Sequence, residues 1–387
     1  MNRAMTSILG RLSPAAFMRD YWQQRPLLIR QALPGFAGIV ERDALLGLAT
    51  RADATSRLVI EHPRRRGADH WERHDGPFGG LDAAMLPPSH WTLLVHGVES
   101  LVPGGWELLR RFDFLPAARV DDLMVSYAAP GGSVGPHEDR YDVFLLQGPG
   151  RRRWQVSERG DHAIDPTAKI KVLQSFQAEE EWLLEPGDML YLPPSVAHYG
   201  VAEDACFTYS IGFLAPSHEE LAQSFLGYLG GALSQSFAAD ALLVDGDRAP
   251  TQTPLSLPPP MVAEVASILD GIRWDKSLVE RFLGCFLTRP KPHVAFAPPA
   301  RPLSPDAFVR RLGGKGALGL ALPTRGLVQR SRIFCNGEAH DVDAATARAF
   351  TTLVRDRALP LPQAWPDDTQ ELLYGWYLAG YLGFEKR

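Results

Sequence analysis

Cysteine is scarce in this 387-residue sequence: it occurs three times, at widely separated positions, and never as a CxxC pair. An odd, dispersed set excludes a disulfide framework and a zinc finger. No apolar stretch approaches the ~18 residues that a membrane-spanning helix needs. The first residues also lack the apolar core of a signal peptide. We therefore expect a soluble, cytoplasmic protein with no membrane partner.

Charge of one sign is also limited, because 45 acidic residues oppose 40 basic ones and the net charge is only −5. Residues 1–215 are mildly acidic and residues 296–387 are mildly basic. The basic excess of the tail is small, and no basic, aromatic-rich stripe accompanies it. Direct binding to nucleic acid is therefore not expected.

Glycine and proline, by contrast, are abundant, with 35 and 32 residues, and many of them lie between short apolar runs. The turn sequences APGGS, GPG, EPGD and LPPS lie between such runs. This density of short strands predicts an antiparallel sandwich or double-sheet jelly roll. The predicted strands are Leu123–Ala128, Val143–Gln147, Trp154–Val156, Glu181–Leu184, Met189–Leu192 and Phe207–Phe213.

The flanking segments have a different texture. Residues 13–33 predict a helix and then a strand, and the polar residues 62–90 predict a long loop. Three helices are expected between residues 216 and 295, and a small mixed unit beyond them. We therefore divide the chain into a β-rich N-terminal domain (1–215), a helical domain (216–295) and a C-terminal domain (296–387). The helices expected after residue 215 are His218–Leu229, Pro260–Leu269, Leu278–Thr288, Pro305–Leu312, Ala344–Arg355 and Asp368–Leu378, with strands at Gly326–Phe334 and Ala339–Val342.

Two segments predict a metal site. His137 and Asp139 stand two apart, so on an extended strand both side chains point to the same side. From Gly187 the chain runs five residues to Pro193 and four more to His198, which is the spacing of the second cupin motif. Two histidines and one carboxylate are typical of non-haem Fe(II) oxygenases, which leave positions open for a bidentate cosubstrate and O₂.

A cation follows on the next predicted strand. If Trp154 and Val156 face the barrel interior, alternation also places Arg152 inside, where a buried guanidinium favours a carboxylate partner. The distal carboxylate of 2-oxoglutarate fits this requirement. The alternative is a surface cluster in which Arg152 reaches outward. Thr208 and Ser210 alternate on a later strand and could bind the same acid, although satisfied core hydroxyls explain them equally well.

These residues carry a resemblance. The segment DLMVSY, the dense run PGGSVGPHEDRYDVFLLQGPGRRRW, the segment LEPGDMLYLPP with His198, and the strand ending YSIGF resemble the bacterial ribosomal oxygenases of the JmjC class. The resemblance extends over essentially the whole chain. It implies an α+β protein with a double-stranded β-helix (cupin or jelly-roll) core, a helical region that mediates homodimerisation, and a winged-helix-like C-terminal domain.

The resemblance also implies an activity: an Fe(II)- and 2-oxoglutarate-dependent dioxygenase that 3-hydroxylates an arginine of large-subunit ribosomal protein sixteen, releasing succinate and CO₂. Carried over, the iron ligands are His137, Asp139 and His198, and Arg152 binds 2-oxoglutarate. One departure is Thr208, where the family pattern has asparagine, which leaves the second 2-oxoglutarate contact open. Another branch of the family modifies histidine, so the target residue also stays open.

An arginine substrate requires acidic and aromatic partners near the metal. Glu138, Tyr141 and Asp142 are predicted to supply them, although a solvated loop explains each equally well. Two other functions remain possible at this stage. A cupin followed by a winged helix could be a ligand-sensing transcription regulator, whose DNA binding would depend steeply on salt. A small-molecule cupin enzyme without 2-oxoglutarate would leave Arg152 without a role.

Overall fold

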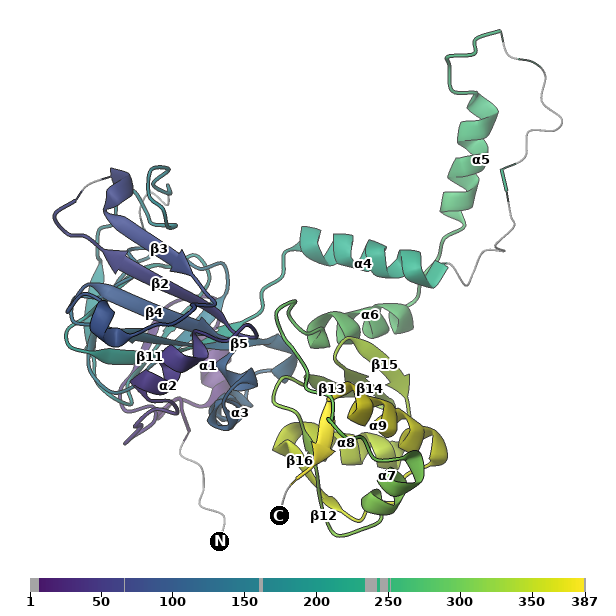
Figure 1. The fold of residues 1–387 in the computed structure, drawn as a ribbon. Coiled ribbons are helices and arrows are strands. Elements are labelled where there is room, and N and C mark those ends of the chain that lie inside the picture. Colours follow the sequence, from purple (N-terminus) through teal and green to yellow (C-terminus); the bar gives the residue numbers. More distant parts are fainter. Residues whose placement is uncertain are drawn as a thin grey trace.

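The computed structural model describes residues 7–65, 67–159, 163–233, 242–243, 250 and 252–385. Figure 1 shows a β-rich N-terminal body, two helices that extend away from it, and a smaller mixed body at the C-terminal end. In the described ranges, no helix is both long and apolar enough to cross a bilayer.

The N-terminal body is built on an eight-stranded antiparallel sheet. Its central strands are buried on both faces, which explains their nearly continuous apolar sequence. In spatial order the strands are β1 (Leu27–Ile29), β9 (Met189–Leu192), β6 (Asp142–Gln147), β11 (Cys206–Phe213), β5 (Val120–Ala128), β4 (Trp91–His96), β2 (Thr55–Glu61) and β3 (Trp71–Asp75).

A smaller antiparallel sheet consists of β10 (Ala197–Ala202), β7 (Arg152–Ser157) and β8 (Glu180–Leu184), in that order. A single β-bridge between His137 and His198 adds a further segment to its edge. Side chains from both sheets form one buried apolar cluster, which includes Leu145, Trp154 and Leu190. This arrangement is the jelly roll that the strand pattern predicts.

Helices cover the outer face of the large sheet. They are α1 (Pro14–Asp20), α2 (Arg42–Leu48) and α3 (Pro103–Leu109), with short 3₁₀ turns at Val98–Ser100, Arg110–Phe112 and Ala117–Arg119. The Ser13 side chain caps α1 by accepting a hydrogen bond from the Ala16 amide, and Pro14 occupies the first turn. On β6, Phe144 packs toward this helical layer while its neighbour Leu145 packs between the sheets. Alternation therefore separates the interior face from the helical face.

Two expectations for this body need correction. The segment 62–90 is not one long loop. It contains β3, which pairs with the preceding strand β2, and 3₁₀ turns at Gly67–Asp69 and Ala83–Met85. The pattern of β3 (WERHD) is too polar to predict a strand, and its three last residues are exposed. The strand β10 is also absent from the sequence-based prediction, because two prolines precede it and its own sequence is AHYGVA.

Beyond the barrel the chain becomes helical, as expected. Helix α4 packs on α6, where Phe225 and Tyr228 contact Phe282, whereas α5 projects away from both bodies (Figure 1). Helix α6 packs against the C-terminal sheet: a β-carbon on Gly284 would lie 2.3 Å from the Phe334 ring. The elements after residue 215 are α4 (His218–Leu233), α5 (Pro259–Asp270), α6 (Lys276–Thr288), α7 (Pro305–Leu312), β12 (Gly316–Leu320), β13 (Gly326–Gln329), β14 (Arg332–Cys335), β15 (Glu338–Asp341), α8 (Ala344–Asp356), β16 (Ala358–Leu361), α9 (Asp367–Ala379) and β17 (Leu382–Phe384).

Candidate metal and cosubstrate site

The three predicted metal ligands meet in space. One side-chain ligand atom from each of His137, Asp139 and His198 lies within 4.8 Å of the other two. His198 Nε2 and Asp139 Oδ2 are 3.8 Å apart, and the two imidazole centroids are 4.3 Å apart. Nitrogen and oxygen donors at these separations can converge on one divalent ion and leave part of its coordination sphere open.

Backbone contacts hold these ligands in place. The amide of His137 donates to the carbonyl of His198, and the amide of His198 donates to the carbonyl of His137, at 3.0 and 2.8 Å. The Ser195 amide, next to the Pro193–Pro194 turn, donates to the carbonyl of Asp139 at 2.7 Å. The turn therefore brings the two ligand-bearing segments together, as the cupin spacing predicts.

Hydrogen bonds also orient both imidazole rings. Nδ1 of His137 donates to the Gly135 carbonyl at 2.9 Å, and Nδ1 of His198 donates to the Val196 carbonyl at 3.0 Å. A carbonyl only accepts, so each Nδ1 carries a hydrogen, and in the neutral ring the Nε2 lone pair is then available to a metal. Burial, reinforced by the neighbouring His137, lowers the pKa of His198 to about 4. The neutral imidazole that a metal requires is therefore the ordinary state of His198.

Arg152 lies inside the barrel, as its alternation with Trp154 predicts, and is only 3% exposed. Its guanidinium donates to Thr208 Oγ1 and to the Gly200 carbonyl, both at 3.3 Å, while the buried Nε has no partner. In the described part of the chain, no carboxylate lies within ion-pair distance of it. Burial consequently lowers the pKa of Arg152. A buried, unpaired guanidinium provides a site for a carboxylate.

Gly200 allows Arg152 and Trp154 to pack directly against its backbone. A β-carbon on Gly200 would lie 2.7 Å from the Trp154 ring and 2.9 Å from Arg152 Nε, so only glycine fits there. Thr208 and Ser210 are buried on β11, and their neighbours Phe207, Tyr209 and Ile211 pack toward the helical layer. Both hydroxyl residues therefore belong to the interior face, and Thr208 contacts Arg152 directly.

The predicted substrate contacts separate into two groups. Tyr141 and Glu138 lie beside the metal ligands in sequence, and both are partly exposed. Burial and the negative charges of Asp139, Asp122 and Asp121 raise the pKa of Tyr141, so its hydroxyl stays neutral beside an acidic group. A β-carbon on Gly212 would lie 3.6 Å from both the Tyr141 ring and Asp122 Oδ1. Asp122 is thus an acidic neighbour that the sequence motifs did not identify.

Asp142 corrects a prediction. It is fully buried, and its carboxylate accepts hydrogen bonds from the Tyr191 hydroxyl at 2.6 Å and from Gln23 Nε2 at 2.9 Å. It precedes Phe144 by two residues and shares its face of β6, toward the helices. The prediction that Asp142 contacts a substrate is therefore wrong, because this side chain anchors the N-terminal segment to the sheet.

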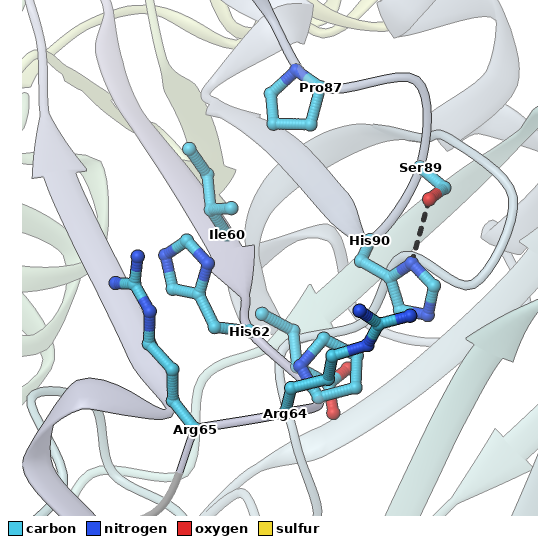
Figure 2. A pocket seen from close by; sticks show the side chains of 9 residues that line it. Ile60, His62, Arg64, Arg65, Pro87, Ser89 and His90 are labelled. Carbon is cyan, nitrogen blue, oxygen red and sulfur yellow. Dashed lines mark hydrogen bonds between the residues drawn. The ribbon is translucent and has the colours of Figure 1, made fainter.

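A pocket of about 440 Å³ opens elsewhere, between the end of β2 and the start of β4. Figure 2 shows Arg64, Arg65, His62 and His90 around it. Arg64 and Arg65 are exposed, as expected of a solvated loop face. The pocket contains none of the three metal ligands, so it is separate from the site above.

The fold and the His–Asp–His site define a JmjC-type oxygenase of the cupin class. Residues 107–221 match the JmjC domain family, and residues 271–383 match the ROXA-like winged helix. The chain belongs to the ribosomal oxygenase family, and the predicted α+β architecture with a winged-helix C-terminal domain is confirmed.

Individual relatives support this membership. The ribosomal protein uL16 3-hydroxylase of Escherichia coli is 32% identical over 347 residues, which cover 89% of each chain. A probable ribosomal oxygenase of Haemophilus influenzae is 41% identical over 213 residues, covering 54% of this chain and 52% of the relative. The solved structure of E. coli YcfD in complex with cobalt and 2-oxoglutarate matches with a TM-score of 0.78 at 29% identity, covering 97% of this chain and 99% of that one.

Proposed function

We propose that this protein is an Fe(II)- and 2-oxoglutarate-dependent hydroxylase that adds a hydroxyl group at C3 of an arginine in large-subunit ribosomal protein sixteen (uL16). The buried, unpaired Arg152 on the barrel wall that also carries His198 is the observation that carries this proposal. The Arg152 guanidinium favours an anionic cosubstrate such as 2-oxoglutarate. A small-molecule cupin enzyme that does not use 2-oxoglutarate would have no such anion at this position. The E. coli relative is named as a uL16 3-hydroxylase, which supports the choice of substrate.

His137, Asp139 and His198 would hold the iron, and their mixed nitrogen and oxygen donors suit Fe(II). When bound, iron with 2-oxoglutarate and O₂ supplies the oxidising power that converts a C–H bond to C–OH, with release of succinate and CO₂. Arg152 would bind the distal carboxylate of 2-oxoglutarate, with the Thr208 hydroxyl orienting the guanidinium. Ser210 lies on the same interior face as a further candidate contact.

The target side chain would enter beside Tyr141. An arginine guanidinium suits this position because the Tyr141 ring would offer a π-face and Asp122 a carboxylate, both beside Gly212, which has no side chain. A half-buried Glu138 follows His137 directly and would border the same entrance. An acidic entrance discriminates against a neutral histidine side chain, so the arrangement favours arginine as the target.

The first experiment is anaerobic. Fe(II) and then 2-oxoglutarate are added to the protein, and the weak visible band of the iron–2-oxoglutarate chelate is recorded beside a His198→Ala variant. A band in the wild type that is lost in the variant supports the site. The second step incubates the protein with a uL16 peptide in air and seeks one added oxygen on arginine by mass spectrometry. Iron binding without a band contradicts the use of 2-oxoglutarate.

We also propose that the protein acts in the cytoplasm, where ribosomal proteins reside, and that it does not contact nucleic acid directly. We further propose that residues 216–295 mediate homodimerisation. Helix α5 supports this, because none of its twelve residues is buried although it carries Val262, Val265, Ile268 and Leu269. Exposed apolar clusters of this kind are typical of association surfaces. A double variant, Val265→Glu with Ile268→Glu, should convert a dimer into a monomer in light scattering. A monomeric wild type would contradict the proposal.

A further inference from the structure

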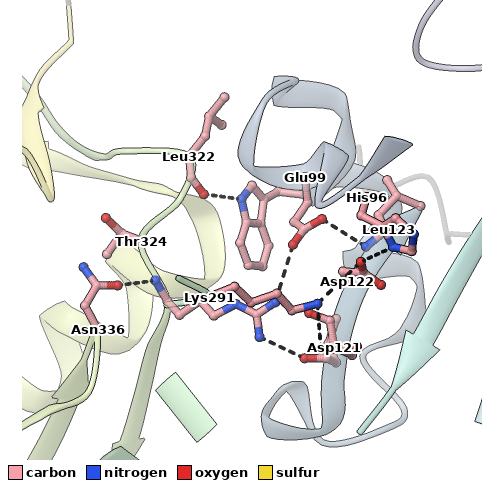
Figure 3. A network of polar contacts seen from close by, with 12 residues as sticks. His96, Glu99, Asp121, Asp122, Leu123, Lys291, Leu322, Thr324 and Asn336 are labelled. Atoms are coloured by element: carbon pink, nitrogen blue, oxygen red, sulfur yellow. Dashed lines mark hydrogen bonds and ion pairs between the residues drawn. The ribbon is translucent and has the colours of Figure 1, made fainter. Parts of the chain in front are cut away.

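The barrel and the C-terminal body are joined by a network of charged side chains (Figure 3). Glu99 is buried, accepts the Leu123 amide at 3.0 Å and pairs with Arg325 of the C-terminal body at 3.4 Å. Arg325 also donates to the carbonyls of Val120 and Asp121. The start of β5 is therefore held by groups that lie more than 160 residues later in the chain.

Lys291, in the segment between α6 and α7, extends this network toward the metal site. Its Nζ lies 3.0 Å from Asp121 Oδ1 and 3.5 Å from Asp122 Oδ2. His96 Nδ1 approaches the same Oδ2 atom at 3.2 Å. Figure 3 shows Lys291 reaching toward both aspartates from the C-terminal side.

The two oxygens of Asp122 consequently have different surroundings. Oδ2 faces Lys291 and His96, whereas Oδ1 lies on the side of Gly212 and the Tyr141 ring. Although burial opposes ionisation, His96 and Lys291 lower the pKa of Asp122 to about 2. The carboxylate is therefore charged at neutral pH, and Oδ1 lies on the side of Tyr141, away from Lys291.

We propose that Lys291 is a positioning residue that fixes Asp122 so that Oδ1 receives the guanidinium of the substrate arginine. This inference rests on the proposed function, because it assumes a cationic target beside Tyr141. It assigns the segment that joins α6 to α7 a part in substrate recognition, because Lys291 in this segment supplies the cation that orients the acidic contact.

The test compares Lys291→Met, which removes the charge at similar length, with Lys291→Arg, which keeps it. Lys169→Met is the matched control, because Lys169 forms an exposed pair with Asp69 at 3.6 Å, outside this network. The probes are a uL16 peptide with one arginine and the same peptide with citrulline, which is close in shape but uncharged. Readouts are kcat and KM for hydroxylation, and binding of the labelled peptide to metal-free protein by fluorescence anisotropy.

We expect K291M to raise KM for the arginine peptide about tenfold, the effect of weakening one charge-assisted hydrogen bond, with kcat little changed. Anisotropy should show a similar loss without metal, and K291R should restore most of the affinity. K169M should match the wild type. The citrulline peptide should bind equally weakly to wild type and K291M, and in an Asp122→Asn background K291M should make no further difference.

Three results would overturn the inference. Unchanged KM and affinity in K291M would show that Asp122 needs no help from Lys291. Tighter binding in K291M would show that Lys291 competes with the substrate. An equal loss for both peptides, or a lower melting temperature that K291R does not restore, would show a structural role. In each case the wild type still hydroxylates the peptide; a wild type that neither binds nor hydroxylates it instead defeats the proposed function itself.

Discussion

Replacing Arg152 by methionine should have opposite effects on cosubstrate affinity and on the stability of the cosubstrate-free protein. The guanidinium is 3% exposed, its Nε has no partner, and its two hydrogen bonds are both long, at 3.3 Å. In the absence of a bound anion, the desolvation of this cation destabilises the folded state. Methionine removes that cost, so we expect the free energy of unfolding to stay the same or to increase.

The loss of 2-oxoglutarate affinity should be large. Removing one partner of a buried, hydrogen-bonded charge pair costs about 2–5 kcal/mol, which corresponds to a roughly 30-fold to several-thousand-fold weaker affinity. The assay is thermal unfolding with Mn(II) in place of iron, titrated with 2-oxoglutarate. Wild-type protein should gain stability with each increase in ligand, and Arg152→Met should not respond.

The neighbouring residue supplies a matched control. Arg153 stands on the opposite face of β7 and forms exposed pairs with Glu181 and Glu203, both at 2.6 Å. Arg153→Met removes the same charge from the same strand and should leave the 2-oxoglutarate response unchanged. Equal 2-oxoglutarate affinity in Arg152→Met and wild type would refute the assignment. A strongly destabilised Arg152→Met would refute the argument that the unpaired cation is costly.

Three further changes test other parts of the structure. The unfolded chain protonates His198 near pH 6.5 and the folded one only near pH 4. As the pH decreases from 6.5 to 4 without metal, the free energy of unfolding from urea titrations should therefore fall more in the wild type than in His198→Leu. The difference should be on the order of 3 kcal/mol, and parallel curves for the two proteins would contradict this. Asp142→Ala should cost about 1–3 kcal/mol, because the Tyr191 hydroxyl loses its buried partner, while the iron–2-oxoglutarate band persists. Arg325→Met should cost about 3–5 kcal/mol by leaving the buried Glu99 without its ion-pair partner, and a melting temperature equal to the wild type would exclude this.

The parts that follow local rules were predictable from the sequence. The strand Met189–Leu192 and the helix Pro305–Leu312 have the predicted bounds, because turns and caps flank both. His137, Asp139 and His198 could be named from spacing alone, and the inward register of Arg152 from strand alternation. Each of these depends on a few neighbouring residues in one segment.

The parts that depend on contacts between distant segments were not predictable. Strand β6 is buried throughout, so its sequence does not reveal which face meets the helices, and Asp142 was assigned to the wrong one. Asp122 lies in the same motif region, but its neighbours Gly212 and Lys291 come from much later in the chain. No local sequence pattern predicts such contacts between distant segments.

The paired backbone hydrogen bonds between His137 and His198 have a consequence for the durability of the barrel. These residues are 61 positions apart, and the chain between them contains β6, β7, β8 and β9. An ion held by both imidazoles would act as a reversible cross-link that closes this long loop and lowers the conformational entropy of the unfolded chain. Chelation should therefore speed protease cleavage between the two histidines far more than cleavage in the C-terminal body.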